Sequence, residues 1–157
     1  MIYVGVDPGK SGGLVAIDAA RRATGRIMPV SGGEVDAHTI GAWLWGLVLQ
    51  HDSQVTVCVE KVHAMPKQGV SSTFTFGVGY GKVLGVVGAL GIRCELVTPQ
   101  AWKASVLAGS LKDKAAAIAW ATRAYPALAL VQPGCRVPHD GVADALCIAE
   151  FARRTYS

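Results

Sequence analysis

Residues 1–13, MIYVGVDPGKSGG, specify the first strand and turn of the chain, on which the predicted fold is built. The first half of this stretch is a short β-rich run that ends in Asp7, and its second half, PGKSGG, has the composition of a tight turn. The apolar segment LVAIDAA, residues 14–20, then returns as the second strand of a predicted hairpin. A further turn at residues 21–25 leads to GRIMPV, the third predicted strand.

Helical and strand patterns alternate after these strands. Apolar side chains recur at helical spacing over residues 34–50, and QVTVCVE, residues 54–60, is a β-branched strand that ends in Glu60. A long helix is predicted for residues 73–90. The next segment, IRCELV, residues 92–97, is the last predicted strand.

Three more helices are predicted in the C-terminal part of the chain. The first starts at Pro99, a residue that suits a first helical turn. The second has Ser110 as its candidate N-cap and runs to Arg123, and the third is alanine-rich and covers about residues 140–154. The order βββαβαβααα predicts one α/β domain over residues 1–157, built around a mixed five-stranded sheet that helices flank.

Length and composition exclude several classes of protein. Hydrophobic residues make up 51% of the 157 residues and charged residues only 17%, unlike the composition of disordered chains. No apolar run reaches the roughly 18 residues of a membrane span, and the first residues lack the basic and apolar regions of a signal peptide. We therefore expect a cytoplasmic protein that does not associate with a membrane.

Positive charge is concentrated in the middle of the chain. The whole sequence carries 15 Lys and Arg against 11 Asp and Glu, a formal net charge of +4. Residues 1–60 sum to −2, residues 61–125 to +6 and the remainder to zero. A basic middle beside segments that contain carboxylates suits a protein that binds a polyanion and also holds a cation. A solvated basic surface is the alternative.

Four acids stand out by their positions. Asp7 and Glu60 each end an apolar strand, and sites in open α/β sheets gather at strand ends. Asp140 and Asp144 are four residues apart and share one face of a helix. Carboxylate oxygens suit Mg²⁺ or Mn²⁺, and two such ions can activate a water and stabilise the leaving oxygen in phosphodiester hydrolysis. These residues are therefore the candidate metal ligands and catalytic residues.

Each acid also has a structural explanation. Asp7 can serve as a turn residue in the D-P-G sequence, Glu60 can point to solvent, and Asp140 can cap the last helix. Asp144 is the hardest to explain in this way, because its neighbours ADALCIA are small and apolar. The PGKSG sequence is not a phosphate-binding P-loop, since the first glycine of that motif would fall on Val4.

Four motifs follow one another along the chain: GVDPGKSGG, VCVEKVHAMPKQGVSSTFTFGVGYGKVLGVVGALG, VTPQAWKASVL and HDGVADALCIAEFA. In this order and at these spacings the chain resembles the RuvC family of Holliday junction resolvases, and most of all the compact RuvC-like endonucleases of bacteriophages. The resemblance extends from residue 1 to about residue 154. It implies an RNase H-like fold, a homodimer and Mg²⁺-dependent cutting of two opposed strands at a four-way junction. A phage origin would place the protein in the cytoplasm of a bacterial host.

The resemblance also assigns the metal site. The family's first-strand aspartate falls on Asp7, its second-strand glutamate on Glu60, and its last-helix acid on Asp144. The other C-terminal acid of the family often lies three residues before that one, where this chain has Gly141, so we assign the role to Asp140. The expected cofactor is a pair of Mg²⁺ ions, with Mn²⁺ as a possible substitute. His139 is a further candidate for positioning water or metal.

Contacts to branched DNA are expected from the basic middle of the chain. The family's backbone-binding lysines fall on Lys103 and Lys114, and further DNA-facing candidates are Lys61, His63 and Lys67. Several relatives carry a wedging aromatic three residues after the glutamate, where this chain has His63. Phe74 and Phe76 lie farther on.

Glycines recur every four residues in the long helix, at Gly77, Gly81 and Gly85. Each helical glycine costs about 1 kcal/mol relative to alanine, so close packing is expected on this stripe, either within the monomer or in a dimer. Two other functions stay open: a nuclease for forks, flaps or hybrids, and a junction-binding module without catalysis. The acids argue against the second, because negative charge near phosphate weakens binding.

Overall fold

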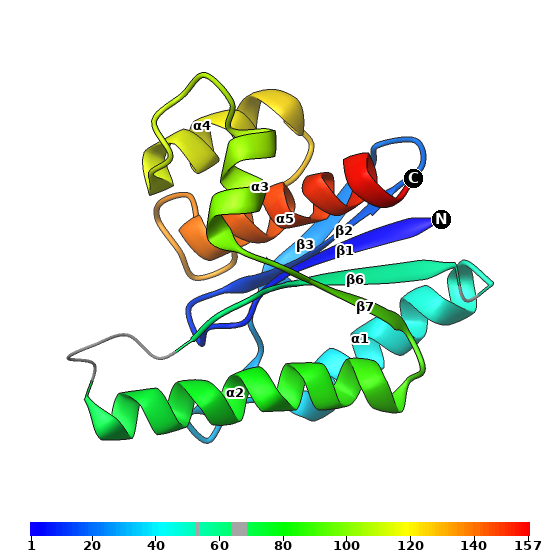
Figure 1. Ribbon diagram of the computed structural model, residues 1–157, viewed down its shortest axis with the longest axis vertical. Helices are drawn as coiled ribbons and strands as arrows, with labels where there is room; N and C mark the ends of the chain where they lie inside the picture. The colour runs from blue at the N-terminus through cyan, green and yellow to red at the C-terminus, as the bar shows by residue number, and fades with distance from the viewer. Residues whose placement is uncertain (53, 64–68) are drawn as a thin grey trace.

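A mixed five-stranded sheet forms the centre of the computed structural model, which describes residues 1–52, 54–63 and 69–157 (Figure 1). Three antiparallel strands lie on one side of the sheet: β1 (Ile2–Asp7), β2 (Gly13–Asp18) and the edge strand β3 (Ala23–Ile27). On the other side, β6 (Val55–Glu60) runs parallel to β1, and β7 (Arg93–Val97) runs parallel to β6. The order β3-β2-β1-β6-β7 confirms the predicted mixed sheet.

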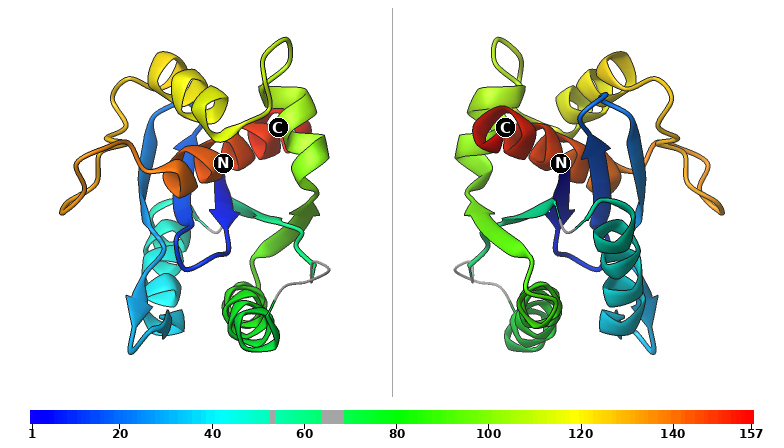
Figure 2. Two further views of the ribbon diagram at one scale, coloured as in Figure 1. Left: turned by 90° about the vertical axis from the view of Figure 1, so that its left-hand side faces the viewer. Right: turned by 90° about the vertical axis from the view of Figure 1, so that its right-hand side faces the viewer.

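Helices cover both faces of the sheet (Figures 1 and 2). Helices α1 (Ala37–Gln50) and α2 (Val70–Ala89) lie on one face. Helix α5 (Asp140–Tyr156) lies on the other face, with α3 (Pro99–Val106) and α4 (Lys114–Ala124) packed against it. In the part of the chain that the structure describes, no helix is long and apolar enough to cross a membrane.

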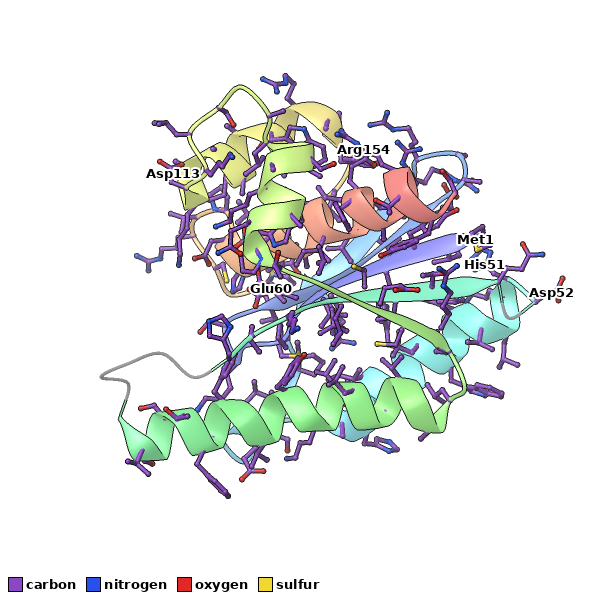
Figure 3. The ribbon with its side chains drawn as sticks, in the orientation of Figure 1. Met1, His51, Asp52, Glu60, Asp113 and Arg154 are labelled. Carbon is purple, nitrogen blue, oxygen red and sulfur yellow. The ribbon has the colours of Figure 1, made fainter. Side chains whose placement is uncertain are left out.

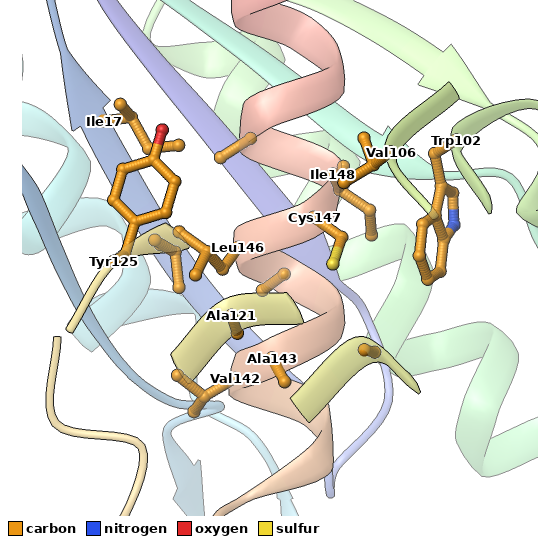
Figure 4. Close-up of a cluster of buried hydrophobic side chains, with 14 of the residues drawn as sticks. Ile17, Trp102, Val106, Ala121, Tyr125, Val142, Ala143, Leu146, Cys147 and Ile148 are labelled. Carbon is orange, nitrogen blue, oxygen red and sulfur yellow. The ribbon is translucent and has the colours of Figure 1, made fainter. Parts of the chain in front are cut away.

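Successive side chains of the strands point to opposite faces of the sheet, so the core is divided into two clusters. In β1, Ile2, Val4 and Val6 pack with α1 and α2, whereas Tyr3 and Gly5 face α5. Figure 4 shows the cluster on the α5 side. Asp7 continues the second set of alternate positions, and Glu60 follows Cys58 on the same face of β6. The period of two therefore directs both strand-end acids towards α5.

Several predicted boundaries were wrong. The residues before α1 form a small hairpin, β4 (Val30–Ser31) with β5 (Glu34–Val35), and Asp36 caps α1 at the residue after it. Helix α2 starts at Val70 instead of residue 73. Helix α4 is capped by Asp113, whose carboxylate accepts the Ala116 N–H at 2.8 Å, and not by Ser110. The Ser110 hydroxyl instead donates to the Leu107 carbonyl at 2.9 Å.

Helix α5 lies directly against the sheet because glycines face it. A Cβ on Gly5 would overlap the Ala145 carbonyl oxygen and the Ala149 nitrogen of α5. A Cβ on Gly13 would lie 2.8 Å from the Gly141 carbonyl oxygen. The start of α5 is thereby held directly against the carboxyl end of β1, where Asp7 lies.

Candidate active site

The strand register places Asp7 and Glu60 beside each other. Strands β1 and β6 are parallel neighbours, with Val6 opposite Val59, and the two acids follow these residues. Both therefore stand at the carboxyl end of the sheet, on the face that α5 covers. Asp7 also keeps the turn contact foreseen as an alternative, since its Oδ1 accepts the Gly9 N–H at 3.3 Å. Asp7 therefore takes part in the turn and also lies beside the other acids.

The first residues of α5 bring the other two acids to this point. Asp140 is the first residue of the helix and Asp144 lies one turn later. His139 is the N-cap, and its Nδ1 accepts the Val142 N–H at 3.4 Å, so the structural role is the one observed for this histidine.

A steric reason explains why position 141 is not the acid. The start of α5 crosses the β1–β2 turn, and a Cβ on Gly141 would lie 2.6 Å from the Cα of Gly12. No side chain fits there without displacing one of the two backbones. The nearest position on the same face of α5 is 140, and an aspartate occupies it.

Burial and mutual repulsion raise the pKa of two of these acids. Burial, with added repulsion from Glu60, Asp144 and Asp140, raises the pKa of Asp7 to about 7. Burial also raises the pKa of Asp144 to about 6, against the opposing effect of Lys103. Two carboxylates that are held close together and partly desolvated are typical of sites that take up a cation.

The two predicted lysines lie near the acids in different ways. Lys114, the first residue of α4, makes an ion pair with Asp140 that lowers the pKa of this carboxyl below its usual range. Lys103 of α3 places its ammonium 5.1 Å from the centre of the Trp102 ring, and its charge acts on Asp144. The charges of both predicted lysines therefore act on the carboxylates of the site.

Glu60 has a partner that sequence reasoning missed. The Trp102 indole N–H donates to Glu60 Oε1 at 2.8 Å. Trp102 is fully buried in the core, and its polar atom fixes a catalytic candidate across 42 residues of sequence. Figure 3 shows Glu60 near the end of β6, close to α3. A single tryptophan beside Lys103 carries no signal of this contact in the sequence.

The donor set fits a hard divalent ion. Asp7, Glu60, Asp140 and Asp144 supply only carboxylate oxygens, the ligands that Mg²⁺ and Mn²⁺ prefer. Across the described ranges, no group of three or more His, Cys, Asp and Glu side chains is already arranged to hold a metal ion. Lys114 pairs with Asp140, so an ion that binds this carboxylate competes with the lysine, whereas Trp102 donates to one oxygen of Glu60 and orients it.

A cleft of ≈ 590 Å³ opens beside the acids. Its lining comes from the start of α5, from Lys114 of α4, from the β1–β2 turn and from the N-terminal half of α2. The residues that line it are Asp7, Pro8, Gly9, Lys10, Ser11, Gly12, Val35, Ser71, Ser72, Thr75, Phe76, Gly79, Lys114, Asp140, Gly141 and Asp144. The cleft therefore contains three of the four acids together with the hydroxyl groups of Ser71, Ser72 and Thr75 on α2. Nothing in the sequence indicated that these hydroxyl groups lie near the acids.

The remaining DNA-binding candidates differ in position. Lys61 and His63 are exposed in the segment after β6. Lys67 lies outside the described residues. Phe74 is 72% exposed on α2, whereas Phe76 lines the cleft.

The metal-free protein is predicted to become more stable as the pH falls from 8 to about 5.5. The pKa of Asp7 lies at about 7 in the folded protein, above its ordinary value of 3.8, so protonation favours the folded state; Asp144 acts in the same direction. Glu60, Asp140 and Lys114 also face this group, and the pKa of Asp140 is lowered, so Asp140 stays charged in this range.

Calorimetry in EDTA is expected to show a rise of about 5 °C in melting temperature over this range. Saturating Mg²⁺ should flatten the trend, since an ion binds the deprotonated acids. A melting temperature that falls steadily between pH 8 and pH 6 would contradict the assignment of these acids.

Comparison with solved structures relates this geometry to known proteins. The structure matches Thermus thermophilus RuvC in complex with a Holliday junction substrate with a TM-score of 0.65 and 20% sequence identity, over 98% of this chain and 95% of that chain. The chain has the RuvC fold. A second T. thermophilus RuvC structure matches with a TM-score of 0.63 and 21% identity, over 99% and 97% of the two chains.

A third solved structure matches this chain with lower identity and a lower TM-score. The yeast mitochondrial Holliday junction resolvase Ydc2 matches with a TM-score of 0.54 and 11% identity, over 96% of this chain and 77% of that chain. No protein-family model matches the sequence, and no curated protein matches it. The similarity confirms the predicted RNase H-like architecture over nearly the whole chain.

Proposed function

We propose that this protein is a metal-dependent DNA endonuclease that resolves four-way (Holliday) junctions by paired cuts. The observation that carries the proposal is the convergence of four acids, from β1, β6 and the start of α5, beside a cleft that contains lysines. The RuvC fold supports it, because the matched structures are described as RuvC and as a Holliday junction resolvase, one of them with junction DNA.

Asp7, Glu60, Asp140 and Asp144 would hold the ions. Two bound Mg²⁺ would supply an activated water and neutralise the leaving oxygen. The residues of the chain itself provide position and charge: Trp102 orients Glu60, and Lys114, the ion-pair partner of Asp140, would bind a backbone phosphate. Lys103, whose charge acts on Asp144, would contact the backbone in the same way.

Trp102→Phe is predicted to raise the Mg²⁺ concentration for half-maximal cleavage by about 10-fold, because it removes the N–H that orients Glu60. Mg²⁺ titrations of the cleavage rate measure this shift. Trp45→Phe is the matched control, since Trp45 is 48% exposed on α1 and should leave the requirement unchanged. An unchanged requirement in Trp102→Phe would mean that the hydrogen bond does not position Glu60.

A homodimer is part of the proposal. Each chain supplies one set of acids, so two coordinated cuts need two chains. The structure supports a contact on α2, because a Cβ on Gly77, Gly81 or Gly85 would meet nothing within 4 Å in the described residues. Packing inside the monomer instead uses Gly79, where a Cβ would lie 2.9 Å from the Val35 side chain. The stripe is thus open for a partner helix.

Gly81→Leu is predicted to convert the dimer into a monomer, since a bulky side chain prevents close approach of two helices. Light scattering should give the mass of one chain, and junction cleavage should yield single nicks in place of paired cuts. Ala119→Leu, an exposed position on α4, is the control and should leave the dimer intact. A dimeric Gly81→Leu variant would move the interface away from α2.

The function is tested by incubating the protein with a synthetic four-way junction, duplex, fork, flap and RNA–DNA hybrid. Each is tested with Mg²⁺, Mn²⁺ or EDTA. We expect symmetric paired cuts in the junction alone, with either metal. Equal cutting of forks and flaps would identify a broader branched-DNA nuclease. Junction binding without cutting in either metal would identify a non-catalytic binding module.

A further inference from the structure

Lys10 lies in the β1–β2 turn, three residues after Asp7, and lines the same cleft as Lys114. In the described part of the chain, Lys10 and Lys114 are the two cations that line this cleft. They differ in their partners. Lys114 is paired with Asp140, whereas within the described residues the Lys10 ammonium donates to one neutral group, the Gly33 carbonyl oxygen, at 3.2 Å.

The nearest acid does not neutralise Lys10. Glu34 lies close enough for Lys10 to lower its pKa, but its carboxylate is held by Lys82 at 2.6 Å. Among the residues that the structure describes, Lys10 has no carboxylate within ion-pair distance. An exposed ammonium that rests on one carbonyl can be transferred to an anion at little cost, since it loses one neutral hydrogen bond and gains a charge-assisted one.

The surroundings of Lys10 suit a phosphate group. Ser71, Ser72 and Thr75 of α2 line the same cleft and offer hydroxyl donors. In the absence of metal the carboxylates of Asp7, Asp140 and Asp144 repel a phosphodiester in the cleft, so positive charge beside them favours the binding of a strand. Lys114 supplies this charge on the α5 side. Lys10 is positioned to supply it on the α2 side.

We propose that Lys10 binds a backbone phosphate of the DNA strand in the cleft, next to the phosphate that is cut and on the α2 side of it. This inference rests on the proposed function. It makes Lys10 a positioning residue that does not touch the reacting atoms. It also assigns a use to the PGKSG turn, whose sequence does not match a P-loop.

The test combines Lys10→Gln with junctions in which single phosphates near the cut are replaced by uncharged methylphosphonates. Binding is measured in EDTA at several salt concentrations. We expect Lys10→Gln to weaken junction binding about 5-fold at low salt and to reduce the salt slope by about one unit. One methylphosphonate should weaken the wild type by a similar factor and leave Lys10→Gln unaffected, because the same contact is already lost. Additive losses at every phosphate would overturn the proposal.

Two controls separate this inference from its alternatives. Arg22→Gln removes the same charge at the opposite end of the sheet, where Arg22 pairs with Asp18, and should leave the salt slope unchanged. Melting temperatures of Lys10→Gln and the wild type should agree; a large drop in Lys10→Gln would show that the Gly33 contact is structural. If the wild type cuts junctions but Lys10→Gln retains the full salt slope, only the role of Lys10 is wrong. If the wild type neither binds nor cuts junctions, the proposed function itself fails.

Discussion

Asp7→Asn is expected to abolish cleavage, by at least about 10³-fold, while making the metal-free protein more stable. The loss of activity follows from removing the central carboxylate of the site. The gain in stability follows from burial and repulsion, which raise the pKa of Asp7 to about 7 and so disfavour its charged form in the folded state. At pH 8 in EDTA, the free energy of unfolding should rise by about 1–3 kcal/mol.

Cleavage of a four-way junction and thermal unfolding measure the two effects on one sample. Asp18→Asn provides the matched control, because Asp18 ends β2 at the far end of the sheet in an exposed ion pair with Arg22. This control should cut normally and gain no stability. If Asp7→Asn cuts as well as the wild type, Asp7 is not a metal ligand.

Gly141→Ala is expected to reduce cleavage about 10²-fold and to destabilise the fold by about 2–4 kcal/mol. A Cβ at this position would lie 2.6 Å from the Cα of Gly12, so either α5 or the β1–β2 turn must shift. Both elements carry acids of the site, and a displacement of about 1 Å is enough to impair catalysis. Gly141→Asp, which restores the family spacing, should be no better.

Gly46→Ala is the opposite control within the same protein. Gly46 also lies in a helix, α1, but a Cβ there would meet nothing within 4 Å among the described residues. Its replacement should therefore stabilise the fold by about 1 kcal/mol through helix propensity alone. Denaturant unfolding of the two variants separates the steric effect from the propensity effect. Gly141→Ala with wild-type stability and activity would show that the start of α5 can move freely.

The strands and the two strand-end acids were predictable because they depend on local pattern. A β-branched run that ends in an acid specifies a strand and the place of its last side chain, and the period of two gives its face. Asp7 and Glu60 obey this rule, and the structure puts them on adjacent strands. The N-cap of α4 was predicted wrongly at Ser110, since Asp113 is an equally good cap by residue type and is the residue that accepts from the first turn of α4.

Other features depend on how distant segments meet. Local sequence pattern was enough to predict the α/β order, the acids at two strand ends and the pair of aspartates on one helix. Three features appear only in the folded chain: Trp102 donates to Glu60, Gly141 has no room for a side chain, and Lys10 and Lys114 line one cleft. These contacts join residues that are tens to more than a hundred positions apart. They follow from the docking of α2, α3 and α5 on the sheet, which no local periodicity encodes.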